Sequence, residues 1–306
     1  MGVGPFFTPY LPPQKNFYRT AIFSSCLRDD LSKCYTNRIA LSYHADGTTE
    51  VLPEYIKTVQ LYIYDANSGA LVERQDIDTD TPSDPTPIVN FNLKSGSKYK
   101  VVAIGNVSDK TSIQGTDSPA GQDIRFGEPR AFTGDESGVN DHLYLGSAII
   151  EGREAFSSEI DYVRLYAVHY NVYVGLDKES FDFTKHQYQW RIGVVPGLCD
   201  VAGHLLTERQ VTYLFEDFTE DQNGRMTIPG AMLRFDPKAV DRITFELLDK
   251  TSGKVLHTLN LGEYLRTKAT DVDLTKQETD ITFFYSCPGT VIQVAPWTEV
   301  GVNPVF

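Results

Sequence analysis

Short runs of alternating apolar and polar residues follow one another along most of the chain. In residues 56–65, positions 59, 61 and 63 are aliphatic, and positions 60, 62 and 64 are Gln or Tyr. Successive side chains of a strand point to opposite faces, so this alternation predicts a β-strand with one face in a core. Similar runs predict strands at 38–43, 70–72, 88–93, 99–104, 188–195, 210–215, 225–228, 242–249, 254–260 and 280–285.

The longest alternating run covers residues 162–176. Its even-numbered positions hold Tyr162, Arg164, Tyr166, Val168, Tyr170, Val172 and Val174. At ~3.3 Å per residue, one straight strand of this length would measure about 45 Å. Strands in globular proteins are usually much shorter, so we expect this one to bend or to carry a bulge near its middle.

Turn signals and polar segments separate the runs. Asn67-Ser68-Gly69 and Thr251-Ser252-Gly253 are expected to be turns, because glycine supplies the left-handed backbone that tight turns require. Residues 76–87 predict an acidic, proline-rich loop, 107–142 a long loop with at most a short helical turn, and 261–265 one helical turn. The pattern therefore predicts an all-β protein with little helix, built as β-sandwiches of the Greek-key type.

The chain is long enough for two such sandwiches. It has 306 residues, and a new series of strands begins at Ile160, after the segment that ends near residue 152. A sandwich of this class needs about 100 residues. We therefore expect a signal-like or disordered leader at 1–25, an N-terminal sandwich at 26–151 and a C-terminal sandwich at 152–306.

Composition supports strands and excludes some classes of partner. There are 17 Tyr and 17 Phe but only 3 Met, and aromatic residues fit a pleated, half-buried surface. The net charge of −13 argues against nucleic acid, whose phosphates require a basic face. It argues equally against direct binding to an anionic lipid surface, so attachment to a membrane would require a covalent lipid. No run of 18 apolar residues is present that could span a bilayer as a helix.

Catalytic and metal-binding signatures are missing from the sequence. There is no Gly-x-Ser-x-Gly, His-Glu-x-x-His or phosphate-loop motif. Asp76, Asp78 and Asp80 have the opening spacing of a calcium loop, but Thr81 and Pro87 replace the glycine and glutamate that the loop needs. We expect no catalytic residues, no metal and no cofactor. A secreted glycan-processing enzyme with a pair of loop carboxylates is the least favoured class.

The nine residues from Cys26 to Cys34 carry the strongest local signal. Ile22-Phe23-Ser24-Ser25 precede Cys26, as at a site where a lipoprotein signal peptidase cleaves and leaves an acylated cysteine. The segment before it is a weak signal peptide, because only Ala21, Ile22 and Phe23 follow the basic residues Lys15 and Arg19. The alternatives are a local disulfide from Cys26 to Cys34 or two buried thiols. In the second half, Cys199 and Cys287 either form a disulfide or stay as separate buried thiols.

Several segments resemble one family of proteins. The stretch from Cys26 to Cys34 resembles the start of mature fimbrial anchor subunits of the FimB type. These are minor fimbrial lipoproteins of Bacteroides-like bacteria, related to the fimbrillins of type V pili. Further likeness lies in 59–72, in 143–147, in Trp297, and in the motif Leu93-x-x-Gly96-x-x-Tyr99-x-Val101-Val102-Ala103-x-Gly105-Asn106.

The resemblance implies two transthyretin-like sandwiches and a structural role. It implies that Cys26 carries palmitate or another acyl chain, and that Asp29 and Asp30 direct the lipoprotein to the surface of the outer membrane. The implied partners are fimbrial shaft subunits, joined by strand exchange. The alternative is a fimbrial tip adhesin or a carbohydrate-binding surface protein, whose exposed tyrosines stack on sugars of host or bacterial surfaces.

The C-terminal segment 291–306 is unusually apolar for a chain end. Residues 291–297 suit the closing strand of their own sandwich, with Trp297 in its core. Beyond them, Gly301 and Pro304 suit an edge or a loose end more than a central strand. We therefore expect 298–306 to pair with a neighbouring fimbrial subunit through its apolar residues, which are Val300, Val302, Val305 and Phe306.

Overall fold

The protein is almost entirely β-structure, as predicted. The computed structural model describes residues 35–79, 86–155, 157–235, 243–267, 273–286 and 289–295. Strands make up 50% of it and helices 7%. The helical segments in these ranges are α1 (Leu52–Tyr55), η2 (Pro119–Gly121), η3 (Pro129–Phe132) and α2 (Leu261–Thr267). The single turn expected at 261–265 is therefore present as α2.

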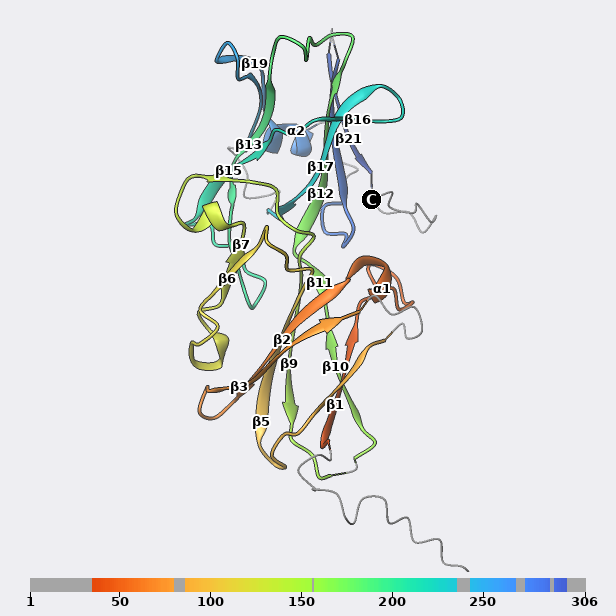
Figure 1. The fold of residues 1–306 in the computed structure, drawn as a ribbon, viewed down its shortest axis with the longest axis vertical. Helices are drawn as coiled ribbons and strands as arrows, with labels where there is room; N and C mark the ends of the chain where they lie inside the picture. Colours follow the sequence, from red (N-terminus) through yellow and green to blue (C-terminus); the bar gives the residue numbers. More distant parts are fainter. Residues whose placement is uncertain are drawn as a thin grey trace, which may run out of the picture. The chain divides into compact units, whose positions relative to one another are not determined.

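The first sandwich packs a three-stranded sheet against a five-stranded one (Figure 1). In spatial order the smaller sheet is β10 (Ile160–Arg164), β1 (Asn37–Ser42) and β4 (Ile88–Phe91). The larger is β11 (Tyr166–Ala167), β9 (Tyr144–Glu151), β5 (Lys98–Gly105), β2 (Thr58–Asp65) and β3 (Leu71–Asp78). Their facing side chains form one buried core that includes Leu41, Leu61, Val101 and Val163.

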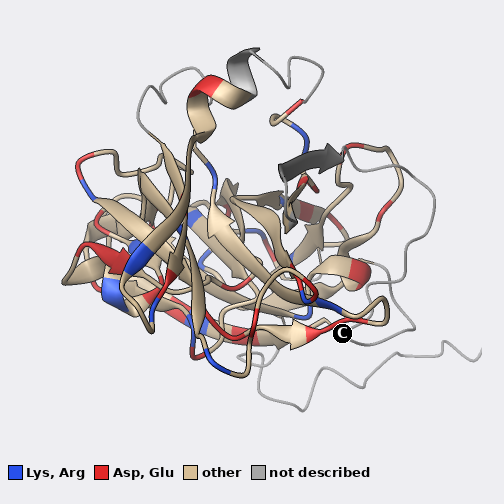
Figure 2. Ribbon diagram, turned by 90° about the horizontal axis from the view of Figure 1, so that it is seen from above, with Lys and Arg blue, Asp and Glu red and all other residues tan. Residues whose placement is uncertain are grey.

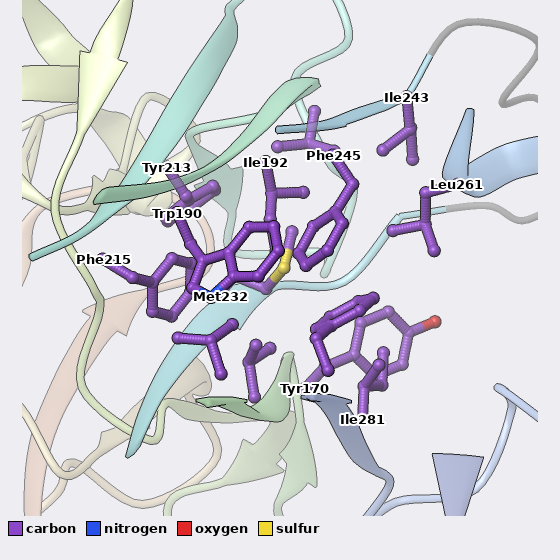
Figure 3. Close-up of a cluster of buried hydrophobic side chains, with 14 of the residues drawn as sticks. Tyr170, Trp190, Ile192, Tyr213, Phe215, Met232, Ile243, Phe245, Leu261 and Ile281 are labelled. Carbon is purple, nitrogen blue, oxygen red and sulfur yellow. The ribbon is translucent and has the colours of Figure 1, made fainter. Parts of the chain in front are cut away.

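The second sandwich pairs two five-stranded sheets. One is β16 (Thr219–Glu220), β17 (Arg225–Leu233), β12 (His169–Asp177), β20 (Asp280–Ser286) and β21 (Gly289–Ala295). The other is β19 (Lys254–Asn260), β18 (Thr244–Asp249), β13 (Tyr188–Pro196), β15 (Gln210–Phe215) and β8 (Glu136–Ser137). At the centre of the core Trp190 stacks on Phe245, with ring centroids 4.3 Å apart (Figure 3). Phe245 also stacks on Phe283, with ring centroids 4.1 Å apart.

The segment 107–142, expected to be a loop, contains additional sheet structure. β6 (Ser112–Gln114) and β7 (Arg125–Gly127) pair with β14 (Cys199–Asp200) in a third small sheet. Ile124 and Phe126 pack with Tyr62, Tyr64, Val102 and Ile104, which point away from the first core. Both faces of β2 and β5 are therefore buried, because this small sheet covers the side of them that faces away from the first core. On β2 that side holds Gln60, Tyr62 and Tyr64, the polar positions of the alternating pattern.

The long alternating run divides into three strands in two sandwiches. β10 pairs in parallel with β1, β11 pairs with β9, and β12 lies between β17 and β20. The interruptions fall at Leu165 and Val168, so the run is not one continuous strand. By strand pairing, the chain therefore leaves the first sandwich after Ala167 and enters the second at His169. Residues 35–306 nevertheless form one compact unit. The expected domain division at 151/152 falls between β9 and β10.

A buried carboxyl group joins the two sandwiches. Glu278 lies two positions before the strand β20, and the residue is 3% exposed. One of its oxygens, Oε1, accepts hydrogen bonds from the hydroxyl groups of Tyr43 and Tyr144, the latter at 2.9 Å. Both tyrosines belong to the first sandwich and are packed edge to face, with ring centroids 4.9 Å apart.

The backbone beside Glu278 is held by further hydrogen bonds. The Arg234 guanidinium donates to the carbonyl oxygens of Leu274 at 3.3 Å, Gln277 at 2.5 Å and Lys276. The side-chain oxygen Oε1 of Gln277 accepts a hydrogen bond from the backbone amide of Ala167 at 2.8 Å. The backbone amide of Gln277 donates to the Asp46 carboxylate at 2.8 Å. The segment 274–278 is thereby fixed to residues of both sandwiches.

Burial controls the protonation of this joint. Desolvation raises the pKa of Glu278, although the tyrosine hydrogen bonds oppose that shift. Desolvation also raises the pKa of Tyr43 and of Tyr144, so both hydroxyls keep their protons and remain donors. Nearby, burial lowers the pKa of His142 and of His169 to about 4, so both imidazoles are neutral at pH 7.

We expect Glu278→Ala to lower the free energy of unfolding by about 2–5 kcal/mol. The change leaves two buried tyrosine hydroxyls without an acceptor, and each such group costs about 1–3 kcal/mol. Glu278→Gln keeps an amide oxygen in the same place and is expected to cost clearly less. Urea unfolding of the two variants measures the difference. Glu73→Ala, on the exposed strand β3, is the matched control, and equal midpoints for it and Glu278→Ala would contradict the role of the joint.

Candidate assembly surfaces

Two of the longer edge strands differ in their suitability for strand addition. The strand β3 is mostly exposed, although Ile77 packs partly against the first core, and it carries Glu73, Arg74, Asp76 and Asp78. Arg74 lies 3.6 Å from Asp76 and over the ring of Tyr62 at 5.5 Å. Charged side chains on an edge strand oppose pairing with another chain. The edge of the first sandwich at β3 is therefore protected, and Figure 2 shows where Lys, Arg, Asp and Glu residues fall along the ribbon.

The strand β19 is a more apolar edge. It ends the sheet formed with β18, β13, β15 and β8, and Lys254 is its only Lys, Arg, Asp or Glu residue. Val255 is 44% exposed, while Leu256 and Leu259 are partly buried against the core of the second sandwich. An apolar edge with few charges is the kind of surface to which a partner strand can be added.

The opposite sheet of the second sandwich ends in the last strand of the described residues. Residues 289–295 form β21, which is antiparallel to β20, with Val294 opposite Ile281 and Ile292 opposite Phe283. Most of the segment 291–297 is thus the last strand of its own sandwich, in accord with the first of the two interpretations of the tail. Residues 296–306 lie outside the described residues, and these include Trp297, Val300, Val302, Val305 and Phe306.

Most of the predicted site residues also lie outside the described part. This applies to Cys26, Asp29, Asp30 and Cys287. Cys199 is described: it is fully buried in β14, it has no disulfide partner in the described residues, and its sulfur lies 3.5 Å from the carbonyl oxygen of Asp200. Burial raises the pKa of its thiol to about 12, so the thiol is unreactive. The pairing of Cys199 with Cys287 stays a prediction.

Two cavities open beside the sandwiches. A cavity of about 360 Å³ lies between η3 and the strands β15 and β17, with a lining that includes Asp109, Lys110, Glu128, Arg130, Glu216 and Asp217. A cavity of about 570 Å³ has a more apolar lining that includes Leu145, Tyr166, Tyr170, Val201, Leu205 and Phe235. Both volumes are in the range of small-molecule sites.

Neither cavity contains an arrangement that indicates a reaction. In the charged cavity Arg130 pairs with Glu128 at 2.9 Å, and Lys250 pairs with the lining residue Glu216 at 3.0 Å. Within the described ranges, no three His, Cys, Asp or Glu side chains are arranged to hold a metal ion. The same ranges include no helix that is long and apolar enough to cross a membrane.

The even-numbered residues of the long alternating run, 162–174, do not all lie in one environment. Tyr162, Arg164 and Tyr166 are exposed, whereas Val168, Tyr170, Val172 and Val174 on the same side of the run are buried. The face changes from exposed to buried where the chain leaves the first sandwich for the second. The even-numbered spacing was visible in the sequence, but the change of environment depends on the partner strands.

The chain shares its fold with solved proteins of Bacteroides species and of Porphyromonas gingivalis. One is a Bacteroides thetaiotaomicron protein with a suggested role in polysaccharide binding. Its TM-score is 0.62 and its sequence identity 17%, and the match covers 86% of this chain and 99% of that chain. Another, from Bacteroides ovatus, has a suggested role as an adhesin. Its TM-score is 0.62 and its sequence identity 15%, and the match covers 86% of this chain and 94% of that chain. A third is the fimbrial anchor protein Mfa2 from Porphyromonas gingivalis, with a TM-score of 0.54 and a sequence identity of 13%. The match covers 85% of this chain and 98% of that chain. No curated protein matches the chain at a significant level.

At such low identities the solved proteins establish the fold alone, and the family is established by the sequence. The family model of the fimbrillin-A associated anchor proteins Mfa1 and Mfa2 matches residues 31–303, which is most of the chain. This match confirms the resemblance to fimbrial anchor subunits on which the sequence prediction rested. The chain therefore belongs to the family of the fimbrillin-A associated anchor proteins Mfa1 and Mfa2.

Proposed function

We propose that the protein is a surface lipoprotein that anchors a fimbrium and joins its shaft to the outer membrane. The observation that carries this proposal is the match to a family of fimbrial anchor proteins over residues 31–303. The match begins within the stretch from Cys26 to Cys34, so the proposed lipid site lies just before the family region. The absence of catalytic motifs from the sequence agrees with a structural role.

The proposed attachment point is Cys26, with Asp29 and Asp30 as the signal for export to the surface. The first described strand, β1, begins at Asn37, eleven positions after Cys26. Eleven residues span at most about 40 Å when fully extended. A lipid on Cys26 would therefore attach through a short tether and would leave both cores unchanged.

The proposed partner is a fimbrial shaft subunit that pairs by strand exchange. The apolar residues Val300, Val302, Val305 and Phe306 follow β21 closely in sequence and would serve as a donor strand. The apolar edge at β19 would serve as an acceptor. Strand addition satisfies a row of backbone groups at once, and side-chain pockets give it specificity.

A second candidate function is adhesion to a carbohydrate. Its support is the exposed side chains of Tyr162 and Tyr166, which are 62% and 48% exposed. One protein of the same fold has a suggested role in polysaccharide binding, and another a suggested role as an adhesin. An anchor that also binds glycan on a cell surface would combine the two functions.

Changing Cys26→Ala should release the protein from the membrane fraction and leave it folded. The acyl chains are the proposed attachment, and two or three chains at ~0.8 kcal/mol per buried CH₂ are ample for stable anchoring. Cell fractionation and uptake of labelled palmitate measure the effect, and Cys34→Ala is the matched control. Retention of the Cys26→Ala protein in the membrane fraction would contradict lipid anchoring at this residue.

Deleting residues 298–306 should abolish association with the fimbrial shaft while surface display and the unfolding temperature stay unchanged. The removed residues follow the strand that closes the sandwich, so the fold does not depend on them under this proposal. Pull-down of shaft subunits and thermal unfolding measure the two effects. The control variant changes only polar tail residues, Glu299→Ala with Asn303→Ala. A fall in unfolding temperature with shaft binding intact would show that the tail completes its own domain.

A further inference from the structure

One exposed strip on the first sandwich combines aromatic rings with an arginine. Tyr162, Arg164 and Tyr166 project outward from β10 and β11, while Val163, Leu165 and Ala167 between them point into the core. We call these three outward residues the tyrosine strip. The two rings are four residues apart along the chain, which corresponds to about 13 Å.

The rings and the guanidinium are fixed relative to one another. Arg164 lies over the ring of Tyr166, 5.4 Å from its centroid, as in a cation–π contact. The backbones of β9 and β10 approach closely at Gly146, where a Cβ atom would lie 2.5 Å from the Arg164 carbonyl oxygen. The strip is therefore carried by paired strands rather than by a loop, and it is organised before any ligand binds.

The charge of the strip is opposite to that of the chain as a whole. The net charge is −13, yet Arg164 has no carboxylate partner in the described residues, and neither does the half-buried Arg38, four register positions away on β1. Arg38 lies opposite Ile160 in the register of β1 and β10, and opposite Asn90 on β4, which is exposed. Two arginines without an acidic partner on one sheet face are complementary to a carboxylate-bearing ligand.

The strip continues into the larger cavity. Tyr166 lines the cavity of about 570 Å³, together with Ser147 and Leu145 of the adjacent strand β9. Ser147 is exposed and supplies a hydroxyl group beside the rings. An extended ligand on the strip would thus meet two ring faces, a guanidinium, a hydroxyl group and a hollow large enough for a terminal group.

We propose that the tyrosine strip binds an acidic polysaccharide whose sugars carry carboxylate groups, such as a polyuronate. The C–H groups on the face of a sugar ring would pack on Tyr162 and Tyr166, whose π faces are electron-rich. Arg164 would pair with a uronate carboxylate between them, because its planar fork matches a carboxylate in two hydrogen bonds. This proposal extends the carbohydrate-binding function and is independent of the lipid on Cys26 and of the shaft junction.

The test is titration calorimetry of the full chain with three polymers. Polygalacturonate is the acidic sugar, fully methyl-esterified polygalacturonate is the same sugar without charge, and poly-glutamate carries charge without sugar. We expect the native protein to bind polygalacturonate at least tenfold more tightly than either of the other polymers. Equal binding of poly-glutamate, or no binding of polygalacturonate, would overturn the proposal.

Two variants with matched controls assign the binding to the strip. The double variant Tyr162→Ala with Tyr166→Ala should weaken polygalacturonate binding at least tenfold. Arg164→Gln should remove the preference for the acid over its methyl ester. The controls are Tyr173→Ala on β12 and Arg225→Gln, whose guanidinium lies 4.7 Å from the ring centroid of Phe284.

The thermal unfolding midpoint should stay unchanged in every variant, because the substituted side chains are exposed. If the strip variants bind polygalacturonate as well as the controls do, the proposal is wrong. If in addition they lose a fimbrial subunit in pull-downs, the strip is instead an interface with protein.

Discussion

The buried carboxyl group of Glu278 is the interaction on which the arrangement of the two sandwiches depends. One oxygen atom accepts hydrogen bonds from Tyr43 and Tyr144 of the first sandwich, and the residue itself lies two positions before the strand β20 of the second. A buried polar network rigidifies a protein when all its members are satisfied. An apolar cluster completes the contact, because Tyr62 and Leu233 share it across the same boundary. These contacts join the two sandwiches within one compact unit.

Much of the fold could be predicted because each sandwich strand has one buried face. The strand at 210–215 was located at its observed bounds, and 254–260 likewise. The segment 107–142 could not be predicted, because its strands β6 and β7 have only three residues each, too few to show a sustained alternation. Ile113 also lies eleven positions before Ile124 and thirteen before Phe126. They act together only after folding brings β6 and β7 side by side over β2.

The candidate sites divide in the same way. Cys26 and the apolar tail are recognisable in sequence because their chemistry is local. Glu278 was one of 41 acidic residues, and nothing in its neighbours shows that two tyrosines from distant strands would reach it. The family assignment makes the protein a fimbrial subunit associated with the cell envelope, in a family of structural anchors and not of enzymes.

The parallel pairing of β1 with β10 determines how the first sandwich responds to tension. A pull on the N-terminal end of β1 is opposed through the C-terminal end of β10, where the chain continues into the second sandwich. Parallel strands loaded in this way slide lengthwise, so all five residue pairs from Arg38 to Ser42 bear the force together. Strands pulled apart from one end would instead lose their hydrogen bonds one at a time. The pair of β1 and β10 therefore resists stretching along its own strand direction.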